Sequence, residues 1–225
     1  MMEKKLVVAI DGPAGAGKST IAKLAAEELD YIYIDTGAMY RAFTYELLTS
    51  SISLSDIEEI TKVLEKTNIE FKNNEIFLNN LNVTNEIRSK NVTANVSAVS
   101  AIPQVREKLV NLQRKIASES NSILDGRDIG TVVFPNAELK IFLTASVKIR
   151  ALRRYNELIA KDKNIDINEI EAEIEKRDKL DSSRETSPLI KAADAIEIDT
   201  SNLSIDEVVN TILKLAEEIC ENESL

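Results

Sequence analysis

Apolar runs and amphipathic stretches alternate along the first fifty residues. Residues 5–11 (KLVVAID) form a short, mostly apolar run, which is typical of a strand buried on both faces. Residues 18–29 carry apolar side chains at helical spacing, and residues 31–35 (YIYID) and 38–48 repeat the order of strand and then helix. Strands that alternate with helices predict a parallel sheet flanked by helices, which is an α/β fold.

The pattern changes between residues 52 and 103. The capping-box sequence Ser55-Asp56-Ile57-Glu58 predicts a helix to about Lys66, and two strand-like runs, 68–72 and 75–78, flank a turn at Asn73-Asn74. We interpret residues 52–103 as an inserted subdomain. The core then comprises residues 1–51 and 104–225.

Strands and helices alternate again after this insert. Pro103 suits the first turn of a helix that runs to about Ser118. Strands are predicted at 122–125, 139–143 and 195–199, helices at 147–161 and 167–179, and a last amphipathic helix after a second capping box, Ser204 to Glu207. The polar stretch 161–164 joins two helices rich in charge, so a segment of about 150–185 is expected to move.

Composition narrows the class of protein. The 225 residues are 44% hydrophobic and 29% charged, as in globular proteins, and no apolar run approaches the ~18 residues of a membrane span. No signal-peptide body follows Met1, so a cytoplasmic location is expected. A net charge of −10 argues against nucleic-acid and membrane partners, so any anion site must be a local pocket.

Two residue counts exclude whole kinds of chemistry. The single cysteine, Cys220, lies in a polar C-terminal tail and rules out an intrachain disulfide or a cysteine metal cluster. The chain has no histidine, which removes Ser-His-Asp systems, histidine-zinc sites and histidine general bases. Any reaction must therefore proceed without imidazole.

A glycine-rich motif lies between the first predicted strand and helix. It reads Gly12-Pro13-Ala14-Gly15-Ala16-Gly17-Lys18-Ser19 and satisfies G-x-x-x-x-G-K-[ST] in the required context. Its backbone N–H groups can surround phosphate oxygens, Lys18 can reach the β and γ phosphates, and Ser19 can bind Mg²⁺. The alternative is a glycine-rich turn with a surface lysine, which this context disfavours.

Polar motifs also follow two other predicted strands, at the carboxyl edge where open parallel sheets bind ligands. In Asp35 to Arg41 (DTGAMYR), Arg41 can bind a phosphate with two parallel hydrogen bonds, although a helix cap with a surface arginine would look the same. In Asp125 to Gly130 (DGRDIG), Asp125 is placed to orient Mg²⁺ or its waters; a plain Asp-Gly turn is the alternative.

Arginines gather on the two helices around residues 161–164. Arg150 and Arg154 share one helix face, with Arg153 beside them, and Arg177, Asp181 and Arg184 share another. These faces could close over transferring phosphates, although most charged faces are simply solvated. A phosphate acceptor is already an anionic nucleophile at neutral pH, so arginines without a histidine base favour an acceptor that is itself a phosphate.

Several of these stretches resemble the bacterial cytidylate kinase family of nucleoside monophosphate kinases over nearly the whole chain. The resemblance is carried by Ile10 to Lys23, Asp35 to Ala42, Val105-Arg106, Asp125 to Pro135, Lys140 to Ala145, Arg177 to Leu189 and Ala192 to Val208. It implies a P-loop NTPase fold with a nucleotide-monophosphate-binding insert and a short lid. It also implies transfer of the γ-phosphoryl group of ATP to CMP or dCMP, with Mg²⁺.

The resemblance assigns roles to individual residues. Its ATP-binding residues are the glycine-rich motif and Thr20, with Lys18, Arg153, Arg154 and Arg177 as catalytic groups and Ser19 and Asp125 as metal ligands. Arg41 and Arg127 would hold the acceptor phosphate, Ser97, Arg106, Asp128 and Arg184 the cytosine, and Thr36, Arg177 and Asp181 the sugar and phosphate. Ser100 is the alternative to Ser97. A monomer is expected.

Two rival functions stay open at this point. One is another small P-loop kinase that acts on UMP, dephospho-coenzyme A or shikimate, for which the three acceptor motifs are the discriminating feature. The other is a nucleotide-binding switch, which would need an Asn-Lys-x-Asp guanine reader, and the sequence contains none.

Overall fold

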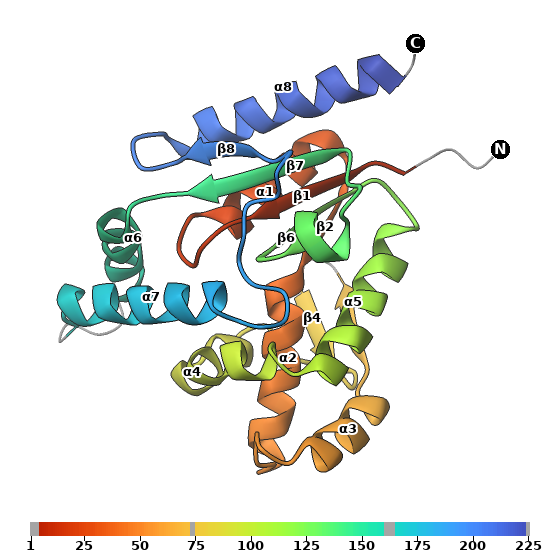
Figure 1. Ribbon diagram of the computed structural model, residues 1–225, viewed down its shortest axis with the longest axis vertical. Coiled ribbons are helices and arrows are strands. Elements are labelled where there is room, and N and C mark those ends of the chain that lie inside the picture. The colour runs from red at the N-terminus through yellow and green to blue at the C-terminus, as the bar shows by residue number, and fades with distance from the viewer. Residues whose placement is uncertain (1–4, 73–74, 160–164, 224–225) are drawn as a thin grey trace. The chain divides into compact units, whose positions relative to one another are not determined.

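The computed structural model describes residues 5–72, 75–159 and 165–223, which form two compact units (Figure 1). The first unit combines Met1–Tyr33 with Ala117–Leu225, and the second is Ile34–Ile116. The insert expected at 52–103 falls within the second unit. The turn expected at Asn73-Asn74 and the polar stretch 161–164 lie outside the described residues.

A five-stranded sheet forms the centre of the first unit. Its order is β2 (Ile32–Asp35, whose last two residues belong to the second unit), β6 (Ser122–Gly126), β1 (Val7–Asp11), β7 (Leu139–Thr144) and β8 (Ile196–Asp199). β1 pairs in parallel with β6 and β7, and β7 pairs in parallel with β8. The predicted α/β fold with a central parallel sheet is therefore confirmed, and β1, which leads into the glycine-rich motif, is the middle strand.

Helices α1 (Lys18–Leu29) and α8 (Ile205–Glu223) cover one face of this sheet. Alternate side chains of the strands, such as Ile10 in β1 and Ile141 in β7, pack with the buried faces of the two helices, as the period of two in a strand requires. The predicted capping box before α8 is confirmed, because the Ser204 and Glu207 side chains each bond the other residue's backbone N–H.

Helices α6 (Val147–Ile159) and α7 (Ile167–Ser182) pack together within the first unit (Figure 1). Ala151 of α6 and Ile170 and Ile174 of α7 form a small apolar core between them, and Asp166 caps α7 by accepting the N–H of Asn168. A π-helical turn, Ile129–Val133, follows β6 and was not predicted. Among the described residues no helix is long and apolar enough to cross a membrane.

The second unit contains helices and a small antiparallel sheet. Its elements are α2 (Thr36–Thr49), α3 (Ile57–Lys66), β3 (Ile69–Lys72), β4 (Glu75–Leu78), β5 (Leu81–Asn82), a 3-10 turn (Glu86–Arg88), α4 (Lys90–Val99) and α5 (Pro103–Ala117), whose last residue belongs to the first unit. The cap expected at Ser55 is wrong by one residue, because Asp56 Oδ1 accepts the N–H of Glu59. Helix α4 escaped prediction because its short apolar face carries only valines, which have low helix propensity.

Candidate active site

The glycine-rich loop leaves β1 and ends at the start of α1. Gly17 lies at the N-cap of α1 with φ of 89°, a left-handed conformation that favours glycine, and no side chain among the described residues caps this helix end. The N–H groups of the first turn therefore stay available to an anion, as in known phosphate sites. Gly12 is required for space, since a Cβ there would lie 2.0 Å from the carbonyl oxygen of Leu143.

Side chains from three elements hold three carbonyl groups of this loop. In a trans peptide the C=O of one residue and the N–H of the next point in opposite directions, so each anchored carbonyl turns the following N–H the other way. The anchors are Lys18 Nζ on Pro13 O (2.8 Å), Arg150 Nη1 on Ala14 O (2.9 Å) and Thr200 Oγ1, whose one proton is shared between Ala16 O (3.3 Å) and Thr144 O (3.1 Å). The fold itself therefore fixes the direction of three loop carbonyls and of the N–H groups that follow them.

Two oxygen-bearing side chains of the kind that can hold a cation lie beside the loop. Ser19 Oγ donates to Asp125 Oδ2 at 2.9 Å, and the Tyr33 hydroxyl donates to Asp125 Oδ1 at 2.8 Å, so the carboxylate at the end of β6 is held from two sides. A hydroxyl and a carboxylate suit Mg²⁺, which takes few protein ligands and fills its shell with water and phosphate oxygens. In the described part of the chain no group of three or more acidic or cysteine residues could hold a metal alone.

Charged side chains of both signs surround the buried amine of Lys18. Burial and the positive charge of Arg127 and Arg177 lower the pKa of Lys18 to about 7, although the negative charge of Asp125 and Asp11 acts in the opposite direction. Desolvation and like charge both disfavour the protonated amine. A bound polyphosphate would reverse this balance, because its negative charge stabilises the ammonium and both guanidinium groups together.

Asp181 of α7 lies between two of the predicted acceptor-binding arginines. Arg127 Nε donates to Asp181 Oδ2 at 2.9 Å, and Arg184 Nη2 contacts Asp181 Oδ1. Burial alone would raise the pKa of Asp181, which is 1% exposed, but the positive charges of Arg127, Arg184 and Arg177 outweigh it and hold the pKa below its ordinary value. The carboxylate therefore stays charged and orients both guanidinium groups.

The two arginines predicted from α6 lie in different surroundings. Arg153 donates from Nη1 to Thr200 Oγ1 (3.0 Å) and from Nη2 to Thr200 O (2.6 Å), so it lies beside the residue that anchors the glycine-rich loop. The Arg154 side chain is 45% exposed and pairs with Glu157 Oε2 at 2.9 Å. The structure thus brings Arg153 to the loop, whereas Arg154 lies on the open face of α6.

The second unit holds four more of the predicted acceptor residues, whereas Asp128 is buried in the first unit. Arg41 of α2 donates from Nη1 to Thr93 Oγ1 (2.9 Å) and Ile87 O (3.3 Å), which fixes its guanidinium group. The Arg106 guanidinium lies 5.7 Å from the ring centroid of Tyr40 and donates to Ser100 O. Thr36 is buried at the first turn of α2, and Ser97 is half-buried on α4.

Three side chains that organise the site were not among the predicted site residues. Arg150 was expected to share an open face with Arg154, but it is buried and also donates to Ala145 O (2.9 Å) and Asp178 Oδ2 (2.6 Å). The anchoring role of Thr200 and the bond from Tyr33 to Asp125 depend on contacts more than 90 residues apart. Only the position of Tyr33, near the end of a predicted strand, pointed to the same sheet edge.

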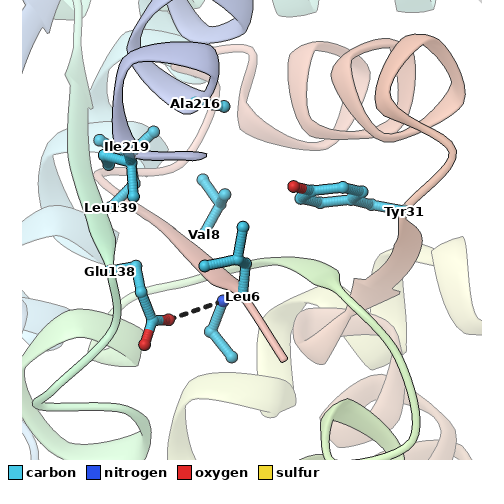
Figure 2. A pocket seen from close by; sticks show the side chains of 8 residues that line it. Leu6, Val8, Tyr31, Glu138, Leu139, Ala216 and Ile219 are labelled. Atoms are coloured by element: carbon cyan, nitrogen blue, oxygen red, sulfur yellow. Dashed lines mark hydrogen bonds between the residues drawn. The ribbon is translucent and has the colours of Figure 1, made fainter. Parts of the chain in front are cut away.

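A small apolar pocket lies at the amino ends of the strands, away from the glycine-rich loop (Figure 2). Its walls come from β1, β7 and α8, and its carboxylate, Glu138, already accepts the N–H of Val7 at 2.8 Å. Cys220, expected in a polar tail, lies on α8 with its Sγ 3.7 Å from the Tyr31 hydroxyl. This pocket offers no cation to a phosphate and is not the candidate site.

Comparison with known proteins shows which family this chain is similar to. Residues 8–218 match the model of the family described as cytidylate kinase. A cytidylate kinase of Fusobacterium nucleatum is 52% identical over 214 residues, which cover 95% of this chain and 98% of that protein. A cytidylate kinase of Listeria innocua is 54% identical over 98% of this chain and all of its own, and one of Ligilactobacillus salivarius is 53% identical over 96% and 99%.

Proposed function

The chain belongs to the cytidylate kinase family, and on that premise we propose that it transfers the γ-phosphoryl group of ATP to CMP or dCMP, giving ADP with CDP or dCDP. One observation of the structure carries this proposal. A buried lysine, Lys18, lies within the field of Arg127 and Arg177, and the Ser19 and Asp125 oxygen pair lies beside the same loop. That arrangement suits two phosphate groups and a divalent cation.

The reaction needs little acid or base chemistry. An oxygen of the CMP phosphate forms a bond to the γ-phosphorus of ATP, and the bond from that phosphorus to the bridging oxygen of the β-phosphate breaks. The acceptor phosphate has a second pKa near 6, so it is largely a dianion at about pH 7 and gives up no proton. Positioning and charge neutralisation therefore suffice, which agrees with a chain that contains no histidine.

The first unit is proposed to hold ATP and the transferring group. Residues 12–20 bind the phosphates through their backbone N–H groups, except for Pro13, which has none, and Lys18 neutralises charge on the β and γ oxygens. Arg177, with Arg153 and Arg154 of α6, stabilises the charge that spreads over the transferring group. Ser19 and Asp125 would hold Mg²⁺, which, when bound, neutralises charge on the β and γ phosphates.

The acceptor is proposed to bind through the residues that the family resemblance assigns to it. Arg41 and Arg127 bind its phosphate, and Thr36, Arg177 and Asp181 lie near its sugar and phosphate. Within the second unit, residues 52–103 form the nucleotide-monophosphate-binding insert, and in the first unit about 150–185 act as a lid. Arg41 and Arg127 are each already oriented by a hydrogen bond to a neighbour, so less rotamer freedom is lost on binding.

Recognition of cytosine is proposed to depend on Asp128, Ser97, Arg106 and Arg184. A carboxylate accepts a hydrogen bond from the exocyclic amine of cytosine, whereas arginine and serine donate hydrogen bonds to the ring carbonyl and N3. At the position of that amine uracil has a carbonyl oxygen, which cannot donate a hydrogen bond to Asp128. A buried carboxylate facing that oxygen loses its partner, so UMP is rejected.

A panel of acceptors tests the proposal. Purified enzyme with Mg²⁺ and ATP is mixed with CMP, dCMP, UMP, AMP or shikimate, and ADP release is followed in a coupled assay. CMP and dCMP should give the highest kcat/KM. Fastest turnover of UMP or shikimate would assign another kinase, and stoichiometric GTP binding without turnover of any acceptor would assign a switch.

A further inference from the structure

Asp11, the last residue of β1, makes contacts with the loop that follows β6. Its Oδ1 accepts the N–H of Ile129 at 2.8 Å, and its Oδ2 accepts the N–H of Gly130 at 2.7 Å. The backbone of Asp11 is also opposite Gly126 in the parallel register of β1 and β6. One residue therefore fixes the chain on both sides of the span Arg127-Asp128.

The π-helical turn after this span completes the restraint. The carbonyl of Asp128 accepts the N–H groups of Val132 at 2.9 Å and Val133 at 3.1 Å, so the turn that Asp11 anchors also holds the backbone of Asp128. Arg127 is fixed in the same stretch by its bonds to Asp181 Oδ2 and Gly126 O. Both side chains assigned to the acceptor thus project from a backbone that Asp11 positions.

A carboxylate at this place is costly to bury. Asp11 is 5% exposed, and burial raises its pKa to about 6 although the bonds from Gly130 and Ile129 act in the opposite direction. The loop packs closely on the carboxylate, because a Cβ on Gly130 would lie 3.4 Å from Asp11 Oδ2 and 3.2 Å from Lys140 Cδ. An asparagine of the same size offers one acceptor oxygen, and its NH₂ would face a backbone N–H.

We propose that Asp11 is a positioning residue for acceptor recognition: it sets the backbone from which Arg127 meets the acceptor phosphate and Asp128 reads the base. This inference rests on the proposed function, because it assumes that Arg127 and Asp128 contact the acceptor. Asp11 directly precedes Gly12, so a general loss of the fold and a loss of ATP binding are the effects from which the proposed role must be separated.

The substitution Asp11→Asn separates them. The replacement breaks one of two adjacent hydrogen bonds, and the loss of one such bond to a charged group corresponds to about a tenfold change in an equilibrium. We expect KM for CMP to rise about tenfold and the ratio of kcat/KM for CMP over UMP to fall by a similar factor, with KM for ATP changed less than about twofold. An equal rise in both KM values, or an unchanged CMP to UMP ratio, would overturn the inference.

Glu207→Gln is the matched control. Glu207 Oε2 also accepts a backbone N–H, that of Ser204 at 2.8 Å, but it lies at the exposed start of α8, outside the proposed binding residues. Glutamine serves in a capping box as glutamate does, so this variant should keep the CMP to UMP ratio and both KM values of the unsubstituted enzyme. A shift like that of Asp11→Asn would show that the ratio responds to any such exchange and would refute the inference.

Hydrogen exchange on the unsubstituted enzyme gives a second test that does not depend on a folded variant. The amides of Ile129 and Gly130 should exchange about a hundredfold more slowly than unbonded loop amides, without CMP. Exchange at unprotected rates would refute the anchor. If instead the unsubstituted enzyme fails to phosphorylate CMP, the proposed function is wrong; if only the ratio and exchange results fail, the role of Asp11 is wrong.

Discussion

Arg150→Met removes a guanidinium group that joins three segments of the first unit. The side chain is 4% exposed and donates to Ala145 O, Ala14 O and Asp178 Oδ2. Methionine fills a similar volume but leaves two carbonyls and one carboxylate without this donor. Because the Asp178 side chain is 23% exposed, water can replace part of the lost bond.

The expected cost follows from these contacts. Breaking a fully buried ion pair costs about 3–5 kcal/mol, and partial exposure of Asp178 places the loss in free energy of unfolding at about 3 kcal/mol. Activity should fall as well, because Ala14 lies in the phosphate loop and Asp178 is adjacent to Arg177. We expect kcat to drop about a hundredfold. Arg150→Lys keeps the positive charge but not the planar set of donors, so its kcat and stability should lie between those of Arg150→Met and of the unsubstituted enzyme.

Urea unfolding and steady-state kinetics measure the two effects. Lys191→Met is the control for stability, because its ion pair with Glu197 is exposed on both sides and should contribute less than about 1 kcal/mol. If Arg150→Met unfolds at the same urea concentration as Lys191→Met, the three bonds do not hold the segments together. If it loses stability but keeps the kcat of the unsubstituted enzyme, the link from Arg150 to the phosphate loop has no part in turnover.

Three further outcomes are expected. Arg41→Ala should raise KM for CMP about tenfold or more with KM for ATP unchanged, and an effect confined to ATP would move Arg41 to the other substrate. Asp128→Asn should lower kcat/KM for CMP and raise it for UMP, a combined change of about 10–100-fold, because an amide can donate to the uracil carbonyl; equal losses for both bases would contradict base reading. Since the pKa of Lys18 is about 7 without phosphate, Lys18 is mostly neutral at about pH 8, where ATP is already fully ionised, so ATP should bind there with uptake of up to about one proton; at about pH 6 Lys18 itself should take up almost none. Calorimetry in buffers of different ionisation enthalpy measures this uptake, and proton release at the higher pH would refute it.

The sequence predicted the elements with strong local patterns. The apolar run before Gly12 became the central strand β1, helix α1 begins and ends at the predicted residues, and the reciprocal bonds of Ser204 and Glu207 start α8. Each of these depends on side chains within a few positions of one another. The glycine-rich motif could be placed for the same reason, because its strand and helix context is local.

The contacts that shape the candidate site are not local. Asp11 meets residues 129 and 130, Arg150 meets Ala14, and Thr200 meets Ala16, over separations of 118 to 184 positions. Composition and periodicity indicate which residues lie on helices and strands, but they do not indicate which distant residues these side chains contact. Helix periodicity put Arg150 on a face with Arg154, yet packing buried one and exposed the other, because Asp178 and the loop carbonyls satisfy only Arg150.

Burial of Asp11 and Lys18 on the two flanks of the phosphate loop has a practical consequence for kinetics. Their pKa values, about 6 and about 7, fall in the interval where histidine ordinarily dominates a titration, and this chain has no histidine. We expect these two groups to contribute an inflection of kcat/KM for ATP near neutrality, once ionisation of the substrates is subtracted, because that ratio reports the free enzyme. Acid–base profiles of this kinase become a direct probe of its loop.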